Sequence, residues 1–225
     1  MHLSKMQCYA KGWCELATNE VAQGAEAQST QRTGGKLKPK DLITVGVFTA
    51  IYFVITSAIG MLGVIPICVP MAAILVPLIG GIPLMLFITK ARKFGMLLIL
   101  STLEGILMFL TGMGYFSIAT GFIFGLAAEL ILKSGNWASS KKSVIAYAVQ
   151  SMWVVGNFIP MFAIRDAYFA PYLSKFGEEY VSVLMSLTPP WTLPLFFVVS
   201  FVSGVIGGLI GRKLYRKHFE RAGIA

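Results

Sequence analysis

Long apolar runs alternate with short polar stretches over most of the chain. Each run is close to the 20 or so residues that a helix needs to cross a bilayer. The pattern predicts an all-α integral membrane protein with six transmembrane helices. The expected spans are 41–64, 66–89, 94–111, 115–132, 143–163 and 191–214.

Two segments lie outside this pattern. Residues 1–35 are polar and lack the apolar centre of a signal peptide, so we expect a disordered or extraneous tail ahead of a membrane domain at 36–220. Residues 164–190 are too polar to cross and are longer than most connections. We expect a short helix there, lying in the membrane interface and covering the mouth of the bundle.

The second span has an unusual number of prolines for a helix: Pro66, Pro70, Pro77 and Pro83. Proline removes a helical hydrogen bond, and the carbonyl freed in this way must be covered by protein or water inside a membrane. We therefore expect this span to be bent or broken.

The positive charges fix an orientation. Of the 19 Lys and Arg residues, all except Arg165 and Lys175 fall on one side of the predicted topology. Positive loops stay in the cytoplasm, so both termini are expected there, in a multi-pass protein of the cell membrane. The net charge of +9 follows from this topology and from attraction to anionic lipid headgroups, without a nucleic-acid partner.

The sequence argues against enzymes and resident cofactors. It contains no Gly-x-x-x-x-Gly-Lys-Ser/Thr loop for ATP, and its only histidines are His2 and His218. Cys8 and Cys14 do not match a zinc motif in their spacing. These features predict no metal and no cofactor, and they favour binding or transport over catalysis.

Two acidic residues lie within predicted spans. Glu104 is near the middle of the third span, where a carboxylate is costly and should face the bundle interior. It is either a contact for a substrate or cation, or a protonated side chain bonded to a neighbouring helix. Glu129 has Lys133 four residues later and is expected to form an ordinary helix ion pair with it.

The remaining binding candidates cluster at the outer side of the predicted topology. Arg165 and Asp166 are adjacent there, and they either meet an anionic substrate or form a surface ion pair of small energetic value. Asn157 lies ahead of Pro160 and could line an outward-facing pocket. The candidates for stacking on a planar ligand are Tyr115, Tyr168 and Trp191.

Gly46 and Ala50 place two small residues one turn apart on the first span, a spacing that lets another helix approach closely. The stretch from Lys38 to Val54 around them, with the six-span layout and the proline-rich second span, resembles the substrate-binding S components of energy-coupling factor (ECF) transporters. More narrowly, the chain resembles the Trep_Strep family. The resemblance covers about residues 36–220.

The resemblance implies a mechanism and partners. In ECF transporters an Ala-xxx-Ala step on the first helix packs against a membrane-embedded T component, and two ATPase subunits supply the energy. Gly46 and Ala50 occupy those positions here, with Gly46 a departure that keeps the side chain small. The expected substrate is a small organic, vitamin-like nutrient. The alternative is a self-contained secondary transporter that couples uptake to protons through Glu104.

Overall fold

The computed structural model describes residues 37–215 and 217, so the expected tail at 1–35 lies outside the described residues. The described part is helical apart from its connections, which confirms the all-α class. The helices are α2 (Pro39–Met61), continued by the 3-10 turn η1 (Leu62–Val64), α3 (Cys68–Lys90), α4 (Met96–Leu110), α5 (Phe116–Ser134), α6 (Ser140–Ser151), the 3-10 turn η2 (Met152–Asn157), α7 (Ile159–Ala163), α8 (Arg165–Leu187) and α9 (Thr192–Leu214).

Within the described ranges, four helices are long and apolar enough to cross a membrane: Pro39–Val64, Cys68–Lys90, Phe116–Ser134 and Thr192–Leu214. α4 is a shorter apolar helix of 15 residues, about 22 Å long at 1.5 Å per residue. These five elements agree with five predicted spans to within two residues at each end.

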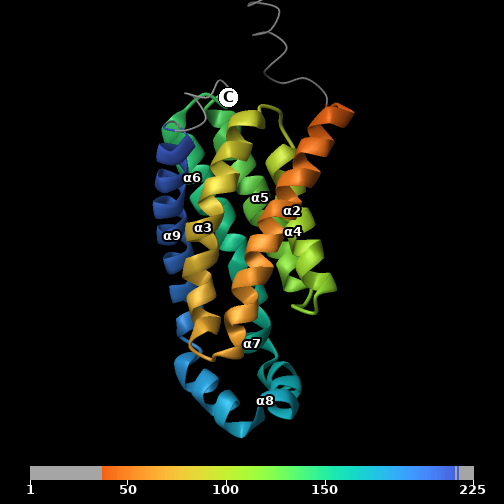
Figure 1. Cartoon of the computed structure of the whole chain (residues 1–225), viewed down its shortest axis with the longest axis vertical. Coiled ribbons are helices and arrows are strands. Elements are labelled where there is room, and N and C mark those ends of the chain that lie inside the picture. Colours follow the sequence, from red (N-terminus) through yellow and green to blue (C-terminus); the bar gives the residue numbers. More distant parts are fainter. Residues whose placement is uncertain (1–36, 216, 218–225) are drawn as a thin grey trace, which may run out of the picture. The chain divides into compact units, whose positions relative to one another are not determined.

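The predicted span at 143–163 is not one helix. α6 ends at Ser151, a 3-10 turn follows to Asn157, and α7 adds only five residues. Figure 1 shows α6 near one end of the bundle and α7 near the other, so the three pieces together run along it. The Thr120 hydroxyl of α5 donates to the Trp153 carbonyl at 3.0 Å, which satisfies a group that the irregular turn leaves open.

α3 is continuous despite Pro77 and Pro83. Because Pro77 has no N–H, the carbonyl of Ala73 loses its helical partner. The Ser200 hydroxyl of α9 donates to that carbonyl at 2.9 Å. The expected break is therefore absent, and the expected cover for the freed carbonyl comes from a neighbouring helix.

Glycines allow α3 and α9 to pack with their backbones in direct contact. A Cβ atom at Gly207 would collide with the carbonyl oxygens of Pro77 and Leu78, and one at Gly81 would collide with the backbone of Gly207. These glycines account for the close approach of the two apolar helices, because small residues drive helix association in a lipid bilayer.

The expected ion pair between Glu129 and Lys133 is wrong. Glu129 Oε2 accepts hydrogen bonds from the backbone N–H groups of Leu97 (2.9 Å) and Leu98 (3.1 Å), in the first turn of α4. Those N–H groups have no partner within their own helix, so the carboxylate caps α4 from α5. Lys133 instead lies 5.4 Å from the centre of the Phe94 ring.

The segment expected to hold a short helix forms α8, which has 23 residues in two arms. The break is at Gly177, whose φ of 84° lies in the left-handed region that favours glycine. Figure 1 shows α8 folded across the end of the bundle at which α7 lies. We call this the α8 end. The opposite end, where α3 and α9 finish and α4 and α6 begin, is called the basic end.

Candidate substrate-binding site

A cavity of about 250 Å³ lies at the α8 end of the bundle. α2, η1, α3, α4, η2 and α8 all contribute to its wall. None of its lining residues is charged. The lining includes Thr56, Gly60, Met61, Cys68, Val76, Met108, Met113, Val154, Asn157, Tyr168, Tyr172 and Phe176. We call this the α8-end cavity.

A column of four aromatic rings on α8 forms one side of this end. Tyr168 stacks on Tyr172 with ring centres 5.1 Å apart, and Phe176 stacks on Tyr180 at 4.7 Å. Tyr172 also stacks on Tyr180 with ring centres 6.3 Å apart, so the rings lie together across the break at Gly177. The Tyr180 hydroxyl donates to the Gly63 carbonyl and holds the second arm against η1. The column offers flat apolar surface to whatever occupies the cavity.

Few polar groups reach the cavity, and their partners are known. The Ser117 hydroxyl donates to Asn157 Oδ1 at 2.7 Å, which leaves the amide N–H₂ of Asn157 as a donor. The hydroxyls of Tyr168 and Tyr172 lie 3.3 Å apart. Burial, and secondarily Tyr172, raises the pKa of the Tyr168 hydroxyl, which therefore keeps its proton at physiological pH. The site can donate hydrogen bonds to a neutral ligand.

Arg165 does not line the α8-end cavity. Its guanidinium donates to the carbonyls of Thr188 (3.2 Å) and Met185 (3.3 Å), and it lies 5.5 Å from the centre of the Phe169 ring. The side chain thus joins the start of α8 to the end of the same helix. Asp166 is exposed and forms no ion pair with Arg165. Of the two outcomes predicted for this pair, the surface ion pair does not form, and contact of Arg165 with an anionic substrate stays a prediction.

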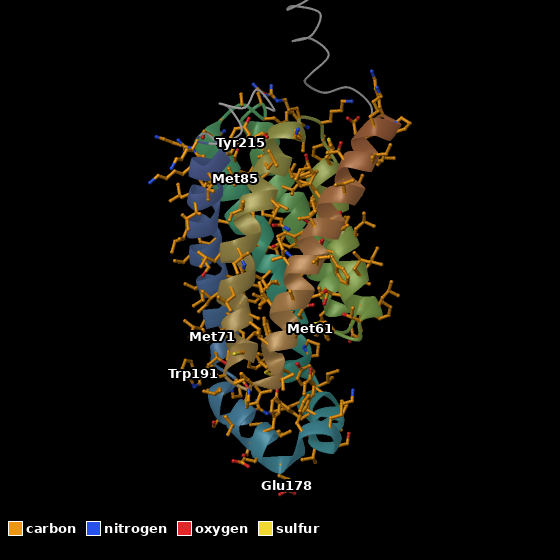
Figure 2. The ribbon with its side chains drawn as sticks, viewed as in Figure 1. Met61, Met71, Met85, Glu178, Trp191 and Tyr215 are labelled. Atoms are coloured by element: carbon orange, nitrogen blue, oxygen red, sulfur yellow. The ribbon has the colours of Figure 1, made fainter. Side chains whose placement is uncertain are left out.

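The other predicted aromatic residues are spread over the α8 end. Tyr115 is exposed and stacks on Phe116, with ring centres 4.4 Å apart. It lines a second hollow of about 200 Å³ that shares Tyr168 and Tyr172 with the α8-end cavity. Trp191 is 69% exposed at the start of α9, and Figure 2 shows it well away from Met61 of the cavity wall.

Glu104 is fully buried, and neither of its carboxylate oxygens has a hydrogen-bond partner among the described residues. Tyr52, Gln150 and Trp153 also have buried polar atoms without partners in the same set. Their neighbours one turn along, Thr56, Met108 and Val154, line the α8-end cavity. The unpartnered polar atoms therefore lie about one helical turn below the floor of the cavity. They belong to four elements that converge in the middle of the bundle.

Gly46 and Ala50 are both exposed on α2. A Cβ atom at Gly46 would meet nothing within 4 Å. Along the same side of α2, Ile43, Val47 and Val54 are also more than half exposed. This side of the helix is exposed and presents small and branched apolar residues to its surroundings.

Asn157 and Tyr168, which the sequence indicates as binding candidates, line the α8-end cavity. Most of the other lining residues are not predicted from the sequence. Met61, Cys68 and Met113 carry no chemical signature that distinguishes them from core residues. Tyr172 and Phe176 could have been found, because the four-residue spacing of the aromatic residues after Tyr168 marks a single helix face.

Comparison with known proteins gives one match. The family model described as "Hypothetical bacterial integral membrane protein (Trep_Strep)" matches residues 39–221, most of the chain. No curated protein and no solved structure matches.

Proposed function

The chain belongs to the Trep_Strep family of bacterial integral membrane proteins, and from that premise we propose that it is the substrate-capturing subunit of an ECF-type importer. It binds a small organic, vitamin-like nutrient at the α8 end and passes it inward with a T component and two ATPase subunits. It performs no catalysis of its own.

The α8-end cavity is the observation that carries this proposal. It is lined by five elements of the bundle and by aromatic rings of α8, and it has no charged lining residue. A mostly apolar pocket with a few placed donors is typical of a small-molecule site. Its volume of about 250 Å³ suits a small ligand.

The topology that goes with this function has six crossings. α4, although short, serves as the third, and the α6–η2–α7 path serves as the fifth. Both termini then lie in the cytoplasm, and the α8 end faces outward, since the Lys and Arg residues gather at the basic end. An outward-facing cavity is what a subunit that captures substrate from outside requires.

The exposed side of α2 is the docking surface for the T component. Gly46 and Ala50 leave room there for a second helix. Gly46→Leu should abolish co-purification with the T component and leave ligand binding intact. Ala119→Leu enlarges an equally exposed small residue on α5 and should leave the complex unchanged. A complex that survives Gly46→Leu would overturn the docking surface.

A second function, proton-coupled secondary transport, is favoured by a different observation. The buried carboxyl of Glu104 has no partner in the described residues and lies below the cavity floor. Intramembrane carboxyl groups of this kind serve as proton relays in transporters. Such a protein would work alone, and Glu104→Gln would abolish its uptake.

One transport assay distinguishes the two functions. Proteoliposomes carrying the full chain, with or without the T component and ATPases, are incubated with deproteinised yeast extract, and untargeted mass spectrometry identifies the compounds that accumulate inside. Our proposal predicts accumulation only with the complete module and ATP. Accumulation by the chain alone under a proton gradient, lost in Glu104→Gln, would contradict it and establish the second function.

A further inference from the structure

A third, larger cavity of about 440 Å³ lies at the basic end, between the end of α3, the start of α6 and the end of α9. Figure 2 shows two of its lining residues, Met85 and Tyr215, near each other at the end of the bundle opposite α8. The proposed function does not use this cavity, so what it binds is a separate question.

The charge of the lining is entirely positive. Arg92 and Arg212 both line the cavity, from different helices, and no acidic residue does. The single ion pair in the described part of the chain joins Lys93 to Asp41 at 2.6 Å and involves neither arginine. Arg92 Nε donates to the Thr89 carbonyl at 3.3 Å, and its two terminal nitrogens have no hydrogen-bond partner among the described residues. Both arginines therefore bring positive charge to the lining of one cavity.

The rest of the lining adds donors on one side and apolar surface on the other. Ser140 brings a hydroxyl at the first position of α6, where the backbone N–H groups of the opening turn also favour an anion. Met85, Ile88 and Trp137 form the apolar part of the wall. Arginine forks match the oxygen atoms of a phosphate group in pairs.

We propose that this cavity binds the phosphate group of an anionic ligand, with Arg92 and Arg212 as its two clamps. The group can come from an anionic phospholipid headgroup or from free phosphate. Basic pockets between membrane helices are known to hold lipid phosphates, and the apolar wall suits a ligand whose remainder is a lipid.

The test is thermal unfolding of the full chain in detergent, titrated with short-chain phosphatidylglycerol, with phosphatidylcholine of equal chain length, and with inorganic phosphate. Phosphatidylglycerol should raise the melting temperature in a saturable way. The double variant Arg92→Gln/Arg212→Gln should weaken the apparent affinity about tenfold or more, because two charge-assisted contacts are lost. The variant Lys141→Gln/Lys213→Gln removes the same charge from exposed lysines that do not line the cavity, and it should behave as the wild type.

The arms of the experiment separate the sources. A saturable shift with inorganic phosphate, lost in the arginine variant, assigns the site to free phosphate, and a shift with phosphatidylglycerol alone assigns it to lipid. Equal shifts with phosphatidylcholine, or equal losses in the lysine control, would overturn the proposal. If the glutamine variant does not fold, Arg92→Lys/Arg212→Lys keeps the charge without the fork and should still bind less tightly. Wild-type affinity in that variant would count against the two clamps.

Discussion

The two ends of the bundle each contain a cavity, and their linings differ. At the α8 end, about 250 Å³ is lined by aromatic, aliphatic and uncharged polar side chains. At the basic end, a cavity of about 440 Å³ has two arginines among its lining residues. Charge at one end of this chain is therefore not evidence about the ligand that binds at the other end. Arg165, the one cation predicted for the α8-end ligand, donates to carbonyls at the end of α8 and does not line the cavity.

Hydrogen bonds to charged groups also serve different purposes at the two ends. At the basic end, Glu129 caps α4 and Asp41 pairs with Lys93, so the charges fix the bundle itself. At the α8 end, Arg165 joins the start of α8 to the end of the same helix. We therefore expect the loss of Glu129 to affect the whole fold and the loss of Arg165 to affect α8 alone.

The largest effect is expected at Glu129. Glu129→Ala leaves the N–H groups of Leu97 and Leu98 without a partner, and hydrogen bonds to a charged group contribute about 1.5–3 kcal/mol each. The free energy of unfolding should fall by about 3 kcal/mol or more, measured by thermal unfolding in detergent. Glu129→Gln retains an acceptor oxygen and should lose less. Equal stability of Glu129→Ala and the wild type would show that the cap does not stabilise the fold.

The next effect is at Arg165. Arg165→Gln removes two hydrogen bonds to the end of α8, and because the side chain is half-exposed the loss should be about 1–2 kcal/mol and confined to α8. Limited proteolysis should cut α8 faster while the melting temperature of the bundle hardly changes. Lys175→Gln removes the same charge from an exposed position on α8 and should not change the cleavage rate. Equal effects of the two variants would show that charge, and not the clamp, matters.

A smaller effect is expected at Gly177. Its φ of 84° is strained for any residue with a Cβ, so Gly177→Ala should destabilise the bent conformation of α8 by about 1 kcal/mol. Hydrogen exchange of the α8 amides should rise. Gly46→Ala, where a Cβ meets nothing within 4 Å, is the matched control and should leave exchange unchanged. Unchanged exchange in Gly177→Ala would mean that the arms are not held by this backbone position.

The smallest effect is at Lys133. Because Lys133 forms no ion pair with Glu129, Lys133→Ala loses only its contact with Phe94, and the free energy of unfolding should change by about 0.5 kcal/mol or less. A loss of unfolding free energy close to that of Glu129→Ala would support the ion pair between Glu129 and Lys133 that the sequence predicts.

The sequence predicts the helices of this bundle well where one property repeats along the chain. Apolar run length places five of the predicted spans to within two residues, because a helix that crosses a bilayer needs about 20 consecutive apolar residues. It does not reveal the 3-10 turn after Ser151, because residues 152–155 remain apolar and the irregular backbone depends on Thr120 of another helix.

The candidate site is less predictable, because its interactions join residues that are distant in sequence. Nothing near Glu129 indicates that its partners are Leu97 and Leu98. Likewise, Arg165 meets carbonyls at Met185 and Thr188 only after α8 bends at Gly177. Asn157 could be placed because a polar side chain within an apolar span is a local signal, and Tyr168 because it is an aromatic residue in the polar segment 164–190.

The most direct test of the central claim is whether the α8-end cavity holds the substrate. The full-length protein is purified from cells in detergent, and untargeted mass spectrometry compares the small molecules that it retains with those retained by Tyr172→Ala and by Arg92→Gln/Arg212→Gln. Tyr172→Phe keeps the ring and serves as the folding control.

We predict an uncharged small molecule that the wild type, Tyr172→Phe and the arginine variant retain and that Tyr172→Ala loses. Retention of the same compound by Tyr172→Ala, or its loss only in the arginine variant, would contradict the account.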